Sequence, residues 1–322
     1  MNQNANAILT LCSHLCVRDG VHPLEPKEWG MLAKKLVEQN LQPSDLFLLS
    51  REDFLKRLQM SAEQADRIFK LIDRNASLIF EISRYENMGI YPITRADSQY
   101  PALLKQKLGN QCPPIFYYAG NLELLSRPTV GYVGSRTVGE DDNAFTRKMV
   151  QRTTAQGYGV VSGGAKGVDS IAAEAAMSNG CFSIAYLSDS MERKLKQSSQ
   201  IKAIQNGQQL LLSVVKPDAG FHPGIAMMRN RYIYAQSEAA VIIKSDYNKG
   251  GTWSGAMDNL SHRWCGTFCW NRKTYKGNQA LIQNGAIPID ENWDGDILAA
   301  ALPQAEQQPE QLSLFHFQQE PL

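Results

Sequence analysis

The sequence lacks an apolar run long enough to cross a membrane. None of its stretches approaches the roughly 18 consecutive apolar residues that a membrane-spanning helix needs. Residues 1–7 are polar, and no apolar segment typical of a secretory signal follows them. We therefore expect a cytoplasmic protein with no membrane partner.

Patterns for metals and nucleotide cofactors are also missing. The six cysteines include two C-x3-C pairs, Cys12/Cys16 and Cys265/Cys269, whereas zinc sites usually repeat a tighter spacing. The chain has neither the G-x-G-x-x-G turn of dinucleotide-binding proteins nor the G-x4-G-K-[ST] loop that binds nucleoside triphosphates. We expect no metal and no cofactor, and we interpret the cysteines as buried reduced thiols.

A strong overall charge is absent as well, because the 322 residues carry a formal net charge of only +1. The charge is unevenly distributed: residues 129–290 contain eighteen Lys and Arg against twelve Asp and Glu, a formal charge of +6. A basic region in a near-neutral chain is typical of a protein that binds a polyanion. An ordinary solvated surface gives the same count.

The periodicity divides the chain into three parts. Residues 1–90 have helical spacing and S-x-x-[DEQ] capping patterns, which predict a small helical domain resembling SAM or helix-hairpin-helix modules. Over residues 91–297, short apolar strands alternate with helices, which predicts an α/β fold with an extended, Rossmann-like, doubly wound parallel sheet. Residues 298–322 are rich in Gln and Pro, and we expect them to be disordered.

Three glycine-containing segments follow predicted strands and precede predicted helices. Ligands of open α/β sheets bind at this edge, where free backbone amides and helix dipoles favour anions. The three segments are Gly134-Ser135-Arg136, Ser162-Gly163-Gly164-Ala-Lys166 and Gly250-Gly251-Thr252. We expect their glycines and cations to hold phosphate groups.

Individual residues of these segments have alternative roles. Asp169 is either a ligand-site carboxylate or a residue that starts the next helix, and Thr252 either caps a helix or binds a phosphate. Arg229-Asn230-Arg231 lies on a predicted helix, where residues two apart do not share a face. One arginine therefore points at the ligand while the other pairs internally, and Asn230 fixes a loop or a base edge.

These motifs together resemble the DNA-processing protein A (DprA/Smf) family over roughly residues 95–290. The resemblance is carried by Val133-Gly-Ser-Arg136, Ser162-Gly-Gly-Ala-Lys-Gly-Val-Asp169, Arg229-Asn-Arg231, Gly250-Gly-Thr252 and Lys276-Gly-Asn-Gln-Ala-Leu-Ile-Gln-Asn-Gly-Ala286. The chain differs from the family pattern at Ala173, where histidine is common, and at Trp270-Asn271, where Pro-Gly is common. It also lacks a terminal winged helix, so it resembles a divergent member.

The resemblance implies an accessory protein rather than an enzyme. It implies an extended Rossmann fold that binds single-stranded DNA, dimerises through that domain and supports loading of the RecA recombinase in recombination or DNA uptake. Carried over residue by residue, the implied DNA pocket includes Ser135, Arg136, Gly163, Lys166, Arg229, Asn230 and Arg231. A set of lysines, arginines and glycine amides is suited to a phosphate backbone.

A short apolar motif interrupts the Gln-rich tail. Gln311-Leu312-Ser-Leu314-Phe315 resembles the peptide by which bacterial proteins bind the DNA polymerase sliding clamp. In such a peptide the glutamine occupies a polar subsite and the apolar side chains enter a pocket. Packing of the tail onto its own domain or a second subunit is the alternative.

Two rival functions share this fold. A nucleotide-hydrolysing enzyme needs a carboxylate at the sugar, but Asp169, Glu174 and Asp258 are not in the Gly-Gly-x-Gly-Thr-x-x-Glu arrangement of phosphoribohydrolases. The other rival is a nucleotide-binding protein in phage defence or stress signalling, with a small signal molecule in the same pocket.

Overall fold

The computed structural model describes residues 2–17, 20–297 and 299–300. Its N-terminal part is helical, as the spacing predicts. The elements are α1 (Gln3–Cys12), α2 (Pro26–Glu38), the 3-10 helix η1 (Pro43–Phe47), α3 (Arg51–Lys56), α4 (Ala62–Asp73) and α5 (Asn75–Glu86). The predicted capping patterns form: the side chains of Ser50 and Ser61 accept hydrogen bonds from the backbone amides of Asp53 and Gln64.

The rest of the described chain forms a nine-stranded sheet with helices on both sides. Its elements are β1 (Tyr91–Thr94), α6 (Ala102–Leu108), η2 (Gly109–Gln111), β2 (Ile115–Gly120), η3 (Leu122–Ser126), β3 (Thr129–Val133), α7 (Glu140–Ala155), β4 (Gly159–Ser162), α8 (Val168–Ser178), β5 (Ser183–Leu187), α9 (Met191–Leu195), α10 (Ser198–Gln205), β6 (Gln209–Ser213), α11 (Pro223–Gln236), β7 (Ala239–Ile242), α12 (Gly250–His262), β8 (Gly266–Trp270), α13 (Lys276–Gln283) and β9 (Ile287–Ile289). This Rossmann-like architecture confirms the predicted fold class.

The sheet is mostly parallel, as expected, with an antiparallel addition at one end. The strand order is β1-β2-β6-β5-β4-β3-β7-β8-β9, and β3 to β9 pair in parallel. β1 pairs with β2, and β2 with β6, in antiparallel fashion. The local sequence gives no sign of this extension, because β2 pairs with a strand about ninety residues later in the chain.

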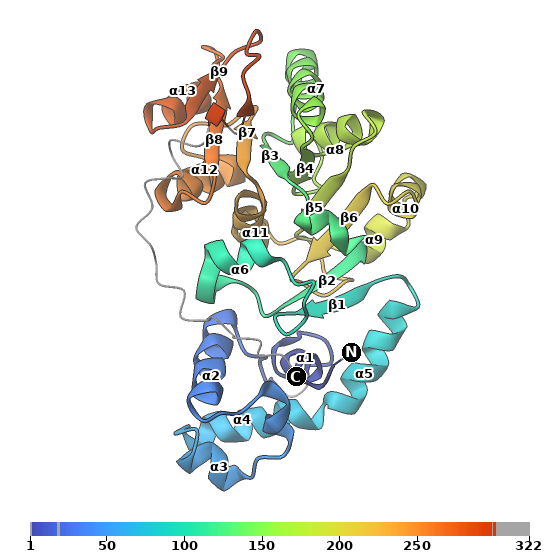
Figure 1. Ribbon diagram of the computed structural model, residues 1–322, viewed down its shortest axis with the longest axis vertical. Helices are drawn as coiled ribbons and strands as arrows, with labels where there is room; N and C mark the ends of the chain where they lie inside the picture. Colours follow the sequence, from blue (N-terminus) through green and yellow to red (C-terminus); the bar gives the residue numbers. More distant parts are fainter. Residues whose placement is uncertain (1, 18–19, 298, 301–322) are drawn as a thin grey trace, which may run out of the picture.

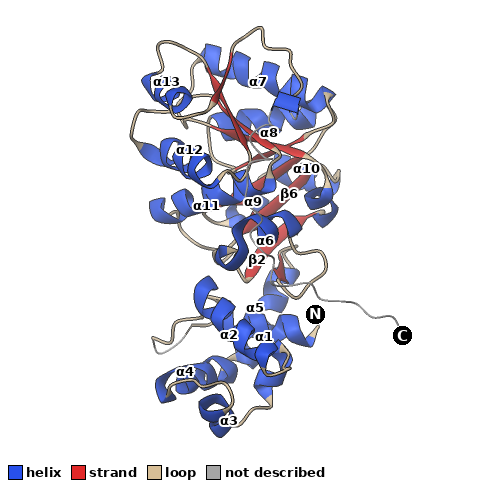
Figure 2. Ribbon diagram, turned by 60° about the vertical axis from the view of Figure 1, so that its left-hand side comes forward, coloured by secondary structure: helices blue, strands red, loops and turns tan. Residues whose placement is uncertain are grey.

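Two helical layers cover the sheet, with α7, α8 and α10 on one face and α6, α11, α12 and α13 on the other (Figure 2). Buried side chains of β7 alternate between the layers. Val241 packs with Phe145 of α7, whereas Ile242 packs with Ala256 of α12. Burial on both faces explains why the strands read as continuous apolar runs.

The helical N-terminal part packs against the end of the sheet that carries β1 and β2 (Figure 1). One hydrophobic cluster crosses the boundary, since Leu9 of α1 and Tyr85 of α5 belong to the same buried group as Tyr117 of β2 and Leu211 of β6. The Ser13 hydroxyl also lies 2.8 Å from the Tyr117 hydroxyl in this buried region.

The order in which strands are added to the sheet changes direction at β3, where β4 lies on one side and β7 on the other. From β3 the chain adds β4, β5 and β6 on one side, then returns to place β7 on the other side of β3. The carboxyl ends of β3 and β7 are therefore the topological switch point, where open α/β sheets bind ligands. Within the described residues, no helix is long and apolar enough to span a bilayer.

Candidate nucleic-acid interface

The loops after β3 and β4 pack tightly at the carboxyl edge of the sheet. A side chain at Gly134 would meet a methyl group of Val168 at 2.5 Å, and one at Gly167 would lie 2.3 Å from the Ser135 carbonyl oxygen. Gly167 also has a φ of +80°, which glycine adopts without strain. These glycines let the Ser135–Arg136 and Lys166–Gly167 segments lie directly against each other.

A buried guanidinium lies beneath these loops. Arg229 of α11 is only 4% exposed, and its Nη1 atom fills the space that a Cβ at Gly163 would take, 1.5 Å from that position. Among the described residues, its Nε atom has no hydrogen-bond partner. Burial lowers the pKa of Arg229, while the Asp169 carboxylate opposes that shift. A buried cation with an unsatisfied donor is costly, and such groups cluster at ligand sites.

Asp169 occupies the position at which a phosphate nest was expected. Its Oδ2 accepts hydrogen bonds from the amides of Gly163 (3.0 Å) and Ala165 (3.2 Å). Burial raises the pKa of Asp169, against the lowering effects of Arg229 and these two amides. Two amides of the Ser162–Gly167 loop are thus already used, so the loop offers a cation and its surface rather than a free amide cradle.

Exposed cations lie on the same edge. The side chains of Arg136 and Lys166 are exposed on adjoining loops. The Arg136 guanidinium lies 4.7 Å from the ring centroid of Phe221, which is 47% exposed in the loop between β6 and α11. A residue outside the loop also holds Gly164 in place, because Lys194 Nζ donates a hydrogen bond to its carbonyl oxygen at 2.6 Å. This edge of the sheet therefore carries exposed cationic side chains next to a partly exposed aromatic ring.

The third predicted segment meets α11 through Asn230. Its Nδ2 donates to the Gly251 carbonyl oxygen at 2.9 Å, so Asn230 holds the first turn of α12 rather than a loop. Gly250 has a φ of +81° and begins α12, with Lys249 as its N-cap. Thr252 lies inside the first turn of α12, so the expectation that it caps the helix is wrong.

Arg231 does not join the other predicted site residues. Its Nη1 donates to Gln111 Oε1 of η2 at 3.0 Å, while Arg229 faces Gly163. Two residues along a helix are separated by about 200°, which places them on opposite sides of α11. Arg231 is therefore the arginine that pairs internally, and the geometry does not bring it to the expected phosphate set.

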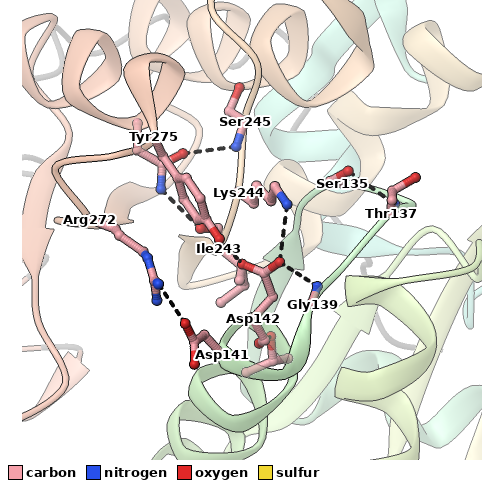
Figure 3. Close-up of polar contacts among 12 residues, drawn as sticks. Ser135, Thr137, Gly139, Asp141, Asp142, Ile243, Lys244, Ser245, Arg272 and Tyr275 are labelled. Carbon is pink, nitrogen blue, oxygen red and sulfur yellow. Dashed lines mark hydrogen bonds and ion pairs between the residues drawn. The ribbon is translucent and has the colours of Figure 1, made fainter.

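A cluster of polar side chains that the sequence patterns missed lies at the switch point between β3 and β7 (Figure 3). Asp142 of α7 is 1% exposed and accepts hydrogen bonds from Gly139 N (2.8 Å), Tyr275 Oη (2.5 Å) and Lys244 Nζ (3.2 Å). Burial raises its pKa, but the bonds from Tyr275, Gly139 and Lys244 outweigh burial and hold it below the ordinary value.

This cluster uses hydrogen-bonding groups that a bound dinucleotide would need. A dinucleotide would place its pyrophosphate at the N-terminus of the helix after the first strand. In this chain the Asp142 carboxylate already accepts the Gly139 amide there, and Arg272 pairs with Asp141 beside it at 2.5 Å. The one local signal is the spacing of Asp142, which lies three residues after the N-cap Gly139 and accepts a hydrogen bond from its backbone amide. Lys244 and Tyr275 come from distant segments.

Comparisons with known proteins identify the family and the fold. The family model described as DNA recombination-mediator protein A matches residues 92–299. The protein Smf of Synechocystis is 28% identical over 180 residues, covering 53% of this chain and 44% of the relative. The DNA processing protein DprA of Streptococcus pneumoniae is 32% identical over 127 residues, covering 39% of this chain and 42% of that protein. The alignments thus span less than half the length of these relatives.

Two solved structures share the fold. The crystal structure of DprA from Streptococcus pneumoniae superposes with a TM-score of 0.66 and 22% identity, over 86% of this chain and 98% of that one. DNA processing protein A from Helicobacter pylori, whose structure concerns single-stranded DNA binding, gives a TM-score of 0.50 and 26% identity, over 62% of this chain and 90% of the other. This chain belongs to the DNA recombination-mediator protein A family.

Proposed function

We propose that this protein binds single-stranded DNA as an accessory factor in recombination, with the phosphate backbone lying along the carboxyl edge of the sheet. The observation that carries the proposal is Arg229, a buried guanidinium beneath Gly163 whose Nε has no hydrogen-bond partner in the part of the chain that the structure describes. A positive charge held in a low-dielectric region acts more strongly on a nearby phosphate than one in water. Arg136 and Lys166, both exposed, flank it and supply direct contacts.

A single strand suits this edge better than a duplex. Proteins that bind single strands combine a cationic track with aromatic faces on which unpaired bases stack. Phe221 provides such a face beside Arg136. The structural relative from Helicobacter pylori is described as binding single-stranded DNA, which agrees with this choice.

Fluorescence anisotropy with a labelled oligothymidylate and a duplex of equal length, over a salt series, tests the proposal. We expect preference for the single strand and affinity that falls steeply with salt. Arg136→Ala and Lys166→Ala should each weaken binding and reduce the slope of log affinity against log salt by about 1. Arg127→Ala is the matched control, since Arg127 precedes β3 at the opposite edge. Unchanged affinity in both site variants would remove the assignment.

A nucleotide competitor separates this proposal from its rivals. Nucleoside monophosphates at millimolar concentration should compete weakly, because Asp142 and Asp141 take up the helix terminus that a bound nucleotide would use. Release of free base from these nucleotides, followed by chromatography, would instead identify a hydrolase.

We further propose that the protein acts as a homodimer in the cytoplasm and passes bound DNA to the RecA recombinase. Family membership supports this role. The test measures RecA-dependent strand exchange on DNA coated with single-strand-binding protein, where the Arg136→Ala variant should lose the stimulation given by the wild type. Sedimentation of the full chain tests the dimer.

Sliding-clamp binding by the tail is a separate proposal. Gln311, Leu312, Leu314 and Phe315 lie outside the described residues, so the sequence motif alone supports it. Burying two such apolar side chains contributes roughly 3–6 kcal/mol before the cost of ordering the tail. Replacing Leu314 and Phe315 with alanine should abolish clamp capture and leave DNA affinity intact. Capture that survives would refute the motif.

A further inference from the structure

An aromatic pair that the phosphate site does not use lies on the loop after β7 and the first turn of α12. Tyr247 is 62% exposed, and its ring contacts Trp253 edge-to-face, with centroids 5.3 Å apart and an interplanar angle of 70°. The two residues flank the start of α12, which begins at Gly250.

The two rings differ in how they are held. Trp253 is partly buried and packs against the cluster of Ile242, Ala256 and Leu281, so the core fixes its position. Tyr247 contacts the Trp253 ring, and most of the Tyr247 side chain is exposed to solvent. An exposed aromatic ring that contacts an anchored one at this edge of the sheet is suited to recognition of a flat apolar surface.

The pair is continuous with the proposed phosphate site. Asn230 adjoins Arg229 on α11 and bonds the carbonyl of Gly251, two residues before Trp253. Arg229 lies under the loop after β4, and β7 is two strands away across β3. Strands are about 4.8 Å apart, so the two loops are separated by about 10 Å. A single strand of a few nucleotides covers that distance.

The exposed charges of the loop that carries Tyr247 sum to zero, so the loop does not repel a polyanion. Lys249 is exposed immediately before α12, and α12 carries no acidic residue in its first turn. Asp246 is exposed on the same loop and is the one acidic residue next to Tyr247. The aromatic pair therefore adjoins a surface on which a phosphate backbone can pass.

We propose that Tyr247, supported by Trp253, is a stacking platform for one unpaired base of the single strand, a few nucleotides along from the phosphate over Arg229. This inference rests on the proposed function and adds to it a contact with bases. Stacking accepts every base, because each has a π face, so the platform distinguishes single from double strands without reading sequence.

The test compares an oligothymidylate with an abasic oligonucleotide of equal length and charge, using the full chain. The wild type should prefer the base-bearing strand by about five- to hundred-fold if one base stacks. Tyr247→Ala should lose part of this preference, with the remainder due to Phe221, and keep its salt slope, while Tyr247→Phe should retain both. Tyr91→Ala is the matched control, because Tyr91 is 42% exposed and forms a similar aromatic pair with Tyr118 at the far end of the sheet.

The outcomes separate the two proposals. If the wild type binds neither strand in a salt-dependent way, the proposed function fails. If Tyr247→Ala keeps the full preference for bases, the platform is wrong while the phosphate site stands. Equal loss of affinity for both strands, or thermal destabilisation of Tyr247→Ala, would show that Tyr247 holds the loop or a protein surface, and would also overturn the platform.

Discussion

Replacing Gly163 with alanine tests the position of Arg229 without touching an exposed charge. The backbone of Gly163 does not have a positive φ, so alanine fits the main chain. Its methyl group would lie 1.5 Å from Arg229 Nη1 and 2.1 Å from Cζ. The guanidinium must move by about 2 Å to reach an ordinary van der Waals distance.

This displacement has two measurable effects. Overpacking of a buried site costs about 1–3 kcal/mol of unfolding free energy, and each kcal/mol lowers the melting temperature by about 2–4 °C in a domain of this size. Moving the charge from about 5 to about 7 Å from a bound phosphate, at an effective dielectric constant of about 20, weakens binding by about 1 kcal/mol, or about fivefold.

A double-mutant cycle with Arg229→Ala makes the test specific. Once the guanidinium is gone, Gly163→Ala should cost no further stability or DNA affinity, giving a coupling energy of about 1–3 kcal/mol. Gly220→Ala is the control, because a methyl group added there would have nothing within 4 Å of it. Thermal unfolding and anisotropy measure both effects. Additive losses would refute the placement of Arg229 under Gly163.

Neighbouring contacts of the same edge give three more predictions. Asp169→Asn keeps an acceptor for the loop amides but removes a negative charge beside Arg229, so single-stranded DNA affinity should rise several-fold in anisotropy; weaker binding would contradict this. Tyr275→Phe should cost about 1 kcal/mol of stability at neutral pH. Because the pKa of Asp142 is lowered in the folded state, the stability that its carboxylate contributes is fully present above its unfolded pKa of about 4 and is lost as pH falls through the lower folded value. Urea unfolding from pH 7 to pH 3 should therefore show that the stability advantage of the wild type over Tyr275→Phe shrinks in acid. A difference that stays constant with pH would refute the role of this bond. Gly167→Ala, at a φ of +80° and 2.3 Å from a carbonyl oxygen, should lower the melting temperature by several degrees, whereas equal stability would show that the loops are not in close contact.

The fold was largely predictable because its signals are local. Apolar runs such as Val130–Val133 and Ala239–Ile242 bury both faces of a parallel strand, and glycines follow them where the chain turns into a helix. The antiparallel addition of β1 and β2 was not predictable. Tyr117 pairs with Ser213, and neither segment carries a sequence signal that points to the other.

Within the candidate site, residue types were easier to predict than contacts. The motifs identified Arg136, Lys166 and Arg229, and helical periodicity required Arg229 and Arg231 to diverge. Periodicity does not say which arginine is buried, since that depends on Gly163 and on Gln111 from other elements. The hydrogen bonds from two loop amides to Asp169 also depend on the loop conformation, which the amino-acid composition does not predict.

The switch-point cluster and the aromatic pair show the same limit. Asp142 lies more than a hundred residues before both Lys244 and Tyr275 in the sequence, and only the folded sheet brings them together. Tyr247 and Trp253 are close in sequence, but their value as a platform depends on the exposure of one ring and the burial of the other.

A crystal structure of the full chain with a short oligothymidylate tests the central claim most directly. The account predicts a phosphate between Arg136 and Lys166, above Gly163 and the buried Arg229 guanidinium. An oligonucleotide bound at the opposite edge near Arg127, or on the helices of residues 3–86, with that position empty, would contradict it.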